Sequence, residues 1–422
     1  MKSQSGTLEI RPLPTEDIDR LLIIAANAFP AFGANSAEEK KKLRETFEGR
    51  NADPRVSVWG AYHRGTLVGG MRLFDYTLSL RGCKIPCSGG GLLVVDLAHK
   101  KEHIARDLVR FWLDHGVKRN VPMAVLWPFR PDFYRKMGFG IGGTINQYRV
   151  EPADLPSHGR RELVRLLGKE DRPAILDCYN RYVDHTNGMI EETALGLDIM
   201  LDANVSWRCA GYEEGGKLGG YLIFDFEPAE PPTFVHNNLK VHRLLYETPD
   251  ALAGLMAFLH AQADQVARVI IPATDEHFHF LLNDVRDSTH NEILMYHQCY
   301  TGGVGIMYRV LNVKGVFCAP MSFRNGLPAC TIRIRLEDSF LSHHDAAVVV
   351  RIAEGRAELI ESGQADVEIG MTVDNFSSLL VGAVNFRALY DYSLARISKP
   401  EMVDTVSQLF ATDRRPVCET RF

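Results

Sequence analysis

Residues 92–105 read LLVVDLAHKKEHIA, and this stretch decides the fold of the chain. Its first four residues are apolar and predict a β-strand, and a helical pattern begins after Ala98. The sequence therefore predicts a strand that leads through a basic turn into the N-terminus of a helix. The N–H groups of a first helical turn are unpaired and the helix dipole is positive there, so such an end favours anions such as a pyrophosphate. Lys100 and Lys101 add positive charge to it.

A second motif, FYRKMGFG at residues 133–140, predicts a short helix that carries Tyr134 and ends in a glycine turn. Together the two motifs resemble the GNAT superfamily of N-acetyltransferases, whose phosphate turn reads R/Q-x-x-G-x-G/A and whose later helix reads F-Y-x-x-x-G-F. Lys100 stands where the family has Arg or Gln, and Ala105 fits the last position. His103 occupies the position of a glycine, the residue that lets a backbone approach a phosphate closely.

The composition bounds the class of protein. A length of 422 residues suggests two to three domains, because single cores stop growing well before that size. The net charge of −5 argues against a nucleic-acid partner, which usually requires a basic surface. No run is long enough to span a bilayer, and no signal peptide follows Met1. We therefore expect a soluble cytoplasmic protein without a membrane partner.

The sequence predicts no metal site. The eight cysteines are scattered, and the closest pair, Cys83 and Cys87, has no second pair at metal-ligand spacing. The histidine pairs at residues 277–279 and 343–344 also lack partners at zinc spacing. We expect these cysteines and histidines to occupy packing, turn or surface positions.

Two internal echoes predict a duplicated domain. IRPLPTED at residues 10–17 resembles VRLLGKED at residues 164–171, each a strand followed by an acidic helix start. AYHRGTLVGG at residues 61–70 corresponds to GYEEGGKLGG at residues 211–220, and both predict a hairpin around a glycine turn. The offset is about 150 residues in both cases, which is the size of one domain.

The second copy lacks the basic turn. Its matching stretch, LLYETPDA at residues 244–251, predicts a helix with Thr248 as N-cap and Pro249 at the first helical position. Glu247 and Asp250 would repel a pyrophosphate, and no lysine or arginine lies in this turn. We therefore expect the first copy to bind coenzyme A and the second not to bind it.

After residue 303 the pattern changes, and a mixed third domain is predicted. Strand-like runs lie at 306–313, 330–336, 347–352 and 357–360, and helix-like segments at 375–381 and 400–411. The predicted fold class is therefore α+β, with tandem GNAT domains, each a mixed sheet flanked by helices, followed by an α+β domain. The predicted domains are a catalytic GNAT domain at 1–150, a degenerate GNAT domain at 151–303, and a third domain at 304–422.

Two GNAT units followed by such a domain resemble the Eis-type (enhanced intracellular survival) acetyltransferases over essentially the whole chain. The resemblance implies that the third domain is similar to a sterol carrier protein. It also implies that the C-terminal carboxylate, here that of Phe422, completes the active site of the first domain. A homo-oligomer, specifically a hexamer, is implied by the same resemblance.

The resemblance assigns roles to individual residues. Tyr134 is the general acid that protonates the coenzyme A sulfur, and the Phe422 carboxylate is the base. A carboxyl group is far less basic than an amine, so we expect this carboxylate to orient the ammonium group and to accept its proton through water. Structural packing of Tyr134 and a frayed chain end are the alternatives for these two residues. The expected acetyl-coenzyme A contacts are Leu93, Val95, Lys100, Lys101, Glu102, His103, Ile104 and Ala105.

The expected function is transfer of an acetyl group from acetyl-coenzyme A to a primary amine by direct attack on the thioester. The amine belongs to a small molecule or to a lysine side chain. Arg130 and Arg421 argue against a highly cationic acceptor, and Trp127 and Phe129 either line the acceptor pocket or pack in the core. The alternative function is non-catalytic binding of a lipid or another apolar ligand, with the GNAT pair as a scaffold.

Overall fold

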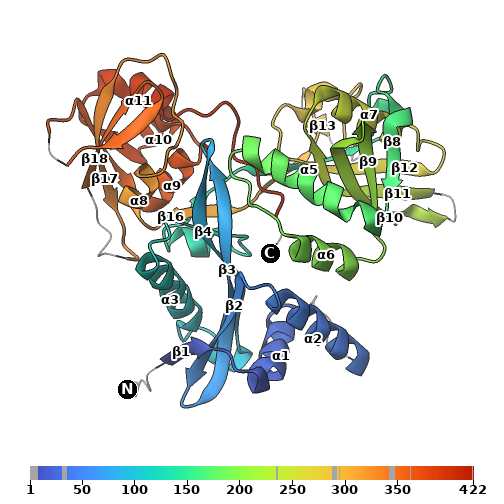
Figure 1. Cartoon of the computed structure of the whole chain (residues 1–422), viewed down its shortest axis with the longest axis horizontal. Helices are drawn as coiled ribbons and strands as arrows, with labels where there is room; N and C mark the ends of the chain where they lie inside the picture. Colours follow the sequence, from blue (N-terminus) through green and yellow to red (C-terminus); the bar gives the residue numbers. More distant parts are fainter. Residues whose placement is uncertain are drawn as a thin grey trace. The chain divides into compact units, whose positions relative to one another are not determined.

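The computed structural model shown in Figure 1 describes residues 8–30, 36–233, 236–287, 292–293, 295–341, 347–361, 363–420 and 422. The described residues form two compact units. The first comprises the chain up to Gly142, Ile306–Pro416 and Phe422, and the second comprises Gly143–Gly305 and Val417–Thr420. Over these ranges no helix has both the length and the apolar character needed to cross a membrane.

The first unit contains a seven-stranded sheet in the order β1-β2-β3-β4-β5-β16-β6. The strands are β1 (Leu8–Pro12), β2 (Val56–His63), β3 (Thr66–Leu80), β4 (Cys83–Val95), β5 (Met123–Leu126), β16 (Met307–Val310) and β6 (Gly140–Ile141). Its helices are α1 (Ile18–Ala28), α2 (Ala37–Asn51), α3 (Ile104–Lys118) and α4 (Pro131–Arg135). β4 and β5 are parallel, and β1 to β4 form an antiparallel meander.

Helices cover this sheet with apolar stripes. α1 lies against β3 and β4 and contacts α2 (Figure 1). α3 presents Ile104, Leu108 and Trp112 to the core, where all three are buried, and Phe111 packs beside them. Residues three and four apart lie on one side of a helix, so these side chains form one apolar face.

The second unit repeats the architecture in the order β15-β7-β12-β11-β10-β9-β8. The strands are β7 (Thr144–Val150), β8 (Val164–Leu167), β9 (Arg208–Glu214), β10 (Lys217–Thr233), β11 (His236–Tyr246), β12 (Val266–Ala273) and β15 (Thr301–Val304). Its helices are α5 (Arg172–His185), α6 (Ala194–Ala203) and α7 (Pro249–His260), and β13 (Glu292–Ile293) pairs with β14 (Tyr296–His297). Both predicted hairpins exist, as β2–β3 and β9–β10.

The third predicted domain forms a five-stranded sheet in the order β19-β18-β17-β20-β21. The strands are β17 (Cys330–Glu337), β18 (Ala347–Ala353), β19 (Arg356–Leu359), β20 (Val367–Thr372) and β21 (Ala395–Ile397). The helices are α8 (Val313–Phe317), α9 (Val373–Leu380), α10 (Phe386–Asp391) and α11 (Val403–Leu409). The α+β class predicted for this region is confirmed.

Two strands lie in a sheet other than that of the domain range in which the sequence analysis placed them. β7 falls inside the predicted range 1–150, yet it pairs with β12 and β15 in the second sheet. β16 falls inside the predicted range 304–422, yet it pairs with β5 and β6 in the first sheet. Strand pairing depends on contacts between segments far apart in the chain. The alternation of apolar and polar residues along one strand does not identify the strand that pairs with it.

Candidate active site

The site begins where β4 separates from its parallel neighbour. β4 pairs with β5 only from Cys87 to Gly90, whereas its pairing with β3 continues to Val95. The register with β3 shifts near Leu92, which has a φ of 47°. This bulge turns the end of β4 away from β5. Of the described strands, none pairs with the β5-facing edge of β4 beyond Gly90, so the backbone of Leu93 and Val95 borders an open gap.

Three consecutive glycines in β4 let aromatic rings approach the strand. A Cβ atom added at Gly89 would lie 2.6 Å from the Tyr76 ring, and one at Gly90 would lie 2.5 Å from the Trp112 ring. Both distances are shorter than van der Waals contact, so a side chain at either position would displace a ring. This stretch of β4 is therefore shaped by aromatic packing on both faces.

The basic turn lies between β4 and α3. A 3-10 turn at Leu97–His99 precedes Lys100, and α3 begins at Ile104 with His103 as its N-cap. Lys101 and His103 have φ values of 69° and 66°, in the left-handed region. Histidine enters this region more readily than most residues with side chains. His103 thus keeps the backbone conformation that glycine favours, and the predicted strand, turn and helix order is confirmed.

This turn and the end of β4 line a cavity of about 320 Å³. Leu93, Val95, Phe129 and Phe133 supply apolar walls. The turn contributes Lys100, Lys101, His103, Ile104 and Ala105. The lining therefore contains every predicted coenzyme A residue except Glu102, whose carboxylate Oε2 lies 3.0 Å from His99 Nδ1. Cationic side chains at a helix N-terminus beside apolar walls suit a pyrophosphate joined to a pantetheine arm.

A second cavity of about 640 Å³ adjoins β3, β4, α1 and α2. Tyr134 and Phe422 both line it, and so do Trp127 and Phe129. Its cationic lining residues are Arg50 and Arg72, which sequence reasoning did not identify. Arg72 is 5% exposed, and burial together with the charge of Arg50 lowers its pKa to about 10. Both arginines remain protonated at neutral pH, so this apolar cavity carries positive charge.

Tyr134 is buried in an aromatic cluster. It lies in α4, which begins after Arg130 with Pro131 at its first position. Its ring centroid lies 5.2 Å from that of Phe133 and 5.9 Å from that of Phe139. Burial raises the pKa of Tyr134 well above the usual range, so the phenol is protonated at neutral pH. The helix supplies a rigid support, and the rings fix the orientation of the phenol.

The chain end is packed. The Phe422 ring makes edge contacts with Phe74 and Tyr76, at centroid distances of 5.3 and 5.1 Å. A Cβ atom placed on Gly91 would lie 3.6 Å from the carboxyl carbon of Phe422. The terminal carboxyl group therefore lies against β4, beside the bulge at Leu92. Arg421, which entered the sequence argument about the acceptor, lies outside the described residues.

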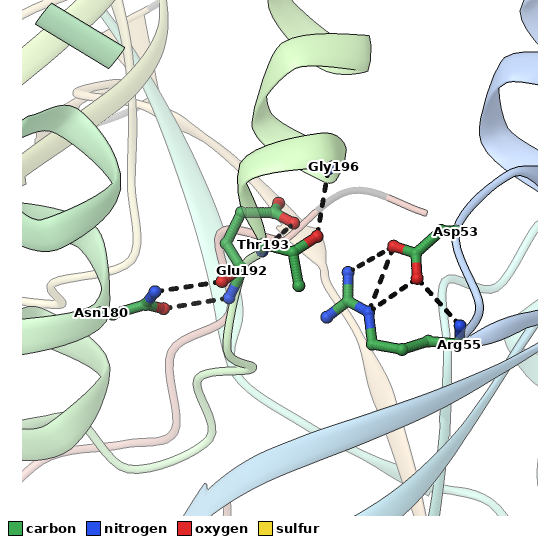
Figure 2. Close-up of polar contacts among 6 residues, drawn as sticks. All are labelled: Asp53, Arg55, Asn180, Glu192, Thr193 and Gly196. Carbon is green, nitrogen blue, oxygen red and sulfur yellow. Dashed lines mark hydrogen bonds and ion pairs between the residues drawn. The ribbon is translucent and has the colours of Figure 1, made fainter. Parts of the chain in front are cut away.

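An ion pair supports the aromatic residues around Phe422. Figure 2 shows the Asp53 carboxylate accepting hydrogen bonds from the Arg55 backbone N–H and guanidinium, at 2.9 and 2.8 Å. The guanidinium carbon of Arg55 lies 5.7 Å from the centroid of the Tyr76 ring. The Tyr76 ring thus contacts both this cation and the Phe422 ring. Arg130, the other arginine in the argument about the acceptor, forms an exposed ion pair with Asp132.

A buried cation lies behind the Tyr134 turn. Arg309 of β16 is fully buried, donates to the Met137 carbonyl and pairs with Asp338. A Cβ atom at Gly138, which has a φ of +80°, would lie 1.3 Å from Arg309 Nη1. The glycine of the tyrosine motif is therefore required both by its backbone conformation and by the space that the guanidinium occupies.

The Arg309–Asp338 pair should contribute strongly to stability. We expect Arg309→Met to lower the free energy of unfolding by about 3–5 kcal/mol, because it leaves Asp338 charged and buried. Arg135 pairs with Asp374 at 3.1 Å, and its side chain is 46% exposed. Arg135→Met should therefore cost less than about 1 kcal/mol. Urea denaturation of both variants measures the difference, and equal losses would contradict this interpretation.

The matching turn of the second unit is acidic. Thr248 caps α7 by accepting from the Ala251 N–H, with Pro249 at the first helical position, as predicted. Glu247 forms an ion pair with Arg181 of α5 at 2.8 Å. Nearby, Asn180 and the Glu192 backbone exchange two hydrogen bonds of 3.0 Å, and Thr193 caps α6 (Figure 2).

Comparison with known families divides the chain into three parts. Residues 9–142 match a family model described as an acetyltransferase (GNAT) domain, and residues 191–310 match a second model with the same description. Residues 317–419 match the model of a sterol carrier protein domain.

Two relatives found by sequence comparison have low sequence identity to this chain. An uncharacterized N-acetyltransferase of Streptomyces coelicolor is 24% identical over 302 residues, which are 66% of this chain and 70% of that protein. One of Streptomyces avermitilis is 23% identical over 267 residues, which are 60% of this chain and 63% of that protein.

Solved structures share the fold over nearly the whole chain. A GCN5-related N-acetyltransferase from Anabaena variabilis superposes with a TM-score of 0.79 at 16% identity, covering 99% of this chain and 100% of its own. Eis1 from Mycobacterium abscessus superposes with a TM-score of 0.78 at 17% identity and the same coverage.

Proposed function

The chain belongs to the GNAT family of N-acetyltransferases, and on that premise we propose that it transfers an acetyl group from acetyl-coenzyme A to a primary amine in the first domain. The observation that carries this proposal is that Tyr134 and the terminal Phe422 line one cavity. Family membership favours this enzyme over the alternative of a non-catalytic scaffold. A panel of amines tested for release of coenzyme A thiol, with the acetylated product identified by mass spectrometry, tests the proposal.

The cofactor-binding part of the proposal rests on the 320 Å³ cavity. Lys100 and Lys101, with the N–H groups that open α3, would hold the pyrophosphate. The open backbone edge at Leu93 and Val95 would pair with the amide groups of the pantetheine arm. These residues bind and orient acetyl-coenzyme A so that its thioester faces the second cavity.

The acceptor amine must lose a proton before it attacks the thioester. The Phe422 carboxylate attracts and orients the ammonium group, whereas Arg50 and Arg72 repel it and so lower its pKa. The carboxylate raises the pKa of the bound ammonium group, whereas the two arginines and burial in the apolar cavity lower it, and a water molecule beside the carboxylate carries the proton away. This division of roles removes the need for the carboxylate alone to be a strong base.

The coenzyme A thiolate that leaves the thioester needs a hydrogen-bond donor, and we assign this role to Tyr134. Burial raises the pKa of its phenol, so the hydroxyl is protonated when the thioester is attacked. The raised pKa also makes complete proton transfer to the thiolate less favourable. Tyr134 thus stabilises the leaving sulfur first by a hydrogen bond, which strengthens as charge develops on the sulfur.

The two arginines narrow the acceptor class. A polycation would meet repulsion from Arg50 and Arg72, whereas an amine with an apolar body and an acidic group would gain an ion pair. We therefore propose a primary amine of that kind, either a small molecule or a lysine side chain next to acidic and apolar groups. A cytoplasmic location remains a prediction from the sequence and a hexamer remains a prediction from family resemblance, and analytical ultracentrifugation tests the hexamer.

Charge reversal in the basic turn should weaken cofactor binding. We expect Lys100→Glu combined with Lys101→Glu to weaken acetyl-coenzyme A binding by about 1–3 kcal/mol, the scale of lost charge-assisted hydrogen bonds. Isothermal titration calorimetry measures both the affinity and the expected stoichiometry of one per chain. Lys314→Glu with Lys399→Glu, on exposed residues of the third domain, gives the same charge change as a control. Two sites per chain, or equal affinities for both double variants, would contradict the assignment.

A further inference from the structure

Three metal-ligating side chains converge beside the basic turn. His63 ends β2, His99 ends the 3-10 turn, and Glu102 lies in the segment that leads to α3. One ligand atom from each lies within 4.8 Å of the others. We propose that His63, His99 and Glu102 bind a divalent transition-metal ion of the Zn²⁺ class. The proposal departs from the sequence-based expectation of no metal site.

The donor set selects the class of ion. Two imidazoles and one carboxylate suit Zn²⁺, Co²⁺ or Ni²⁺, whereas Ca²⁺ and Mg²⁺ prefer oxygen ligands throughout. Zinc holds nitrogen and oxygen ligands at about 2.0–2.2 Å, so the three ligand atoms must adjust to tetrahedral spacing around the ion on binding. The side chains of His99 and Glu102 are 29% and 51% exposed, which allows that adjustment and admits the ion. Three protein ligands leave one position for water or another oxygen.

Sheet topology explains why spacing along the chain did not reveal the cluster. His99 and Glu102 are three residues apart, but His63 comes from a different strand. The hairpin pairs His63 with Thr66, and Gly69 of the same β3 strand pairs with Val95 of β4. The antiparallel meander therefore brings the end of β2 to the end of β4. The His63 and His99 rings lie edge to face, with centroids 6.1 Å apart.

The cluster and the 320 Å³ cavity share His99. A bound ion would tie the β2–β3 hairpin to the turn that carries Lys101 and His103, both in left-handed backbone conformations. It would also add positive charge beside the place proposed for the pyrophosphate. Metal and acetyl-coenzyme A should therefore strengthen each other's binding, an effect that must be reciprocal. This second step rests on the proposed function, whereas the metal site itself does not.

The metal site is tested on the full-length protein after removal of metals with a chelator and of the chelator by dialysis. Calorimetric titration with ZnCl₂ should show one tight ion per chain. His63→Ala should weaken that binding by a factor of ten or more, and Glu102→Gln should weaken it measurably. His277→Ala removes an exposed histidine from the second unit and should change nothing. Titration with CoCl₂ checks the ligands, because cysteine thiolates would give intense near-ultraviolet charge-transfer bands and imidazoles would not.

Thermal melting without metal should be alike for the wild type and His63→Ala, which shows that the variant folds. The proposal is overturned if the wild type binds no Zn²⁺ tightly, or if His63→Ala binds it as the wild type does. Acetyl-coenzyme A affinity is then measured with and without Zn²⁺, and a change of about 5- to 150-fold is expected. Equal affinities would overturn the coupling alone. Metal binding without any acetyl-coenzyme A binding would overturn the proposed function and leave the metal site standing.

Discussion

A C-terminal extension of a few residues after Phe422 should reduce acetyl transfer by about 10²-fold or more. The extension converts the carboxylate beside Gly91 into a neutral peptide carbonyl. It also moves the new chain end away, because an extended chain advances about 3.3 Å per residue. Errors of about 1 Å in the placement of reacting groups can cost about 10²-fold in rate. The ammonium group would then lack its anionic partner and would keep facing Arg50 and Arg72.

Initial rates of thiol release, measured for C-terminally and N-terminally extended proteins with the same amine, check this expectation. The N-terminal extension controls for the added residues. Thermal melting should be nearly the same for both, since the apolar core of the first unit is unchanged. Equal rates for the two proteins would remove the terminal carboxylate from the mechanism and would leave the third domain with a binding or assembly role.

Tyr134→Phe should lower turnover by about 10²-fold, the usual contribution of a positioned acid, while acetyl-coenzyme A affinity stays nearly constant. Only the hydroxyl is removed, and the neighbouring rings of Phe133 and Phe139 keep the side chain packed. Tyr148→Phe is a matched control. Tyr148 is also buried, lies in β7 of the second unit, and lines neither of the two cavities described above. Its loss should leave turnover unchanged.

The pH dependence gives a further check on Tyr134. Burial raises the pKa of its phenol above the ordinary value near 10, so the hydroxyl stays protonated throughout the neutral range. Any loss of turnover caused by its ionisation should therefore appear only above about pH 10. An alkaline limb near pH 8 that disappears in Tyr134→Phe would mean that acetyl-coenzyme A or another group lowers this pKa in the complex.

Local patterns in the sequence predicted the elements that build the site. The glycine-containing hairpins at residues 61–70 and 211–220 and the N-cap at Thr248 follow from interactions within a few residues. The same holds for the strand, turn and helix order of residues 92–105. Each of these features was confirmed because turn chemistry, capping and periodicity act over short stretches of chain.

The conformation at His103 shows a limit of reading motifs by residue type. A glycine in a motif specifies a backbone conformation, and another residue can adopt that conformation when the surrounding turn holds it. His103 and Lys101 both do so. Judged by residue type alone, His103 differs from the glycine of the family motif. Judged by its backbone torsion angle φ, it adopts the conformation that glycine favours at this position.

By itself, the sequence determined the α+β class, the duplication, the basic turn and the position of Tyr134. Only the tertiary structure decided that β7 lies in the second sheet and β16 in the first. It also decided that Arg309 fills the space beside Gly138, and that Arg50 and Arg72 line the acceptor cavity. It also decided that His63 meets His99. The physical reason is the range of the interactions. Capping and periodicity depend on residues that are neighbours in the sequence, whereas strand pairs, buried ion pairs and cavity walls form between segments far apart in the chain.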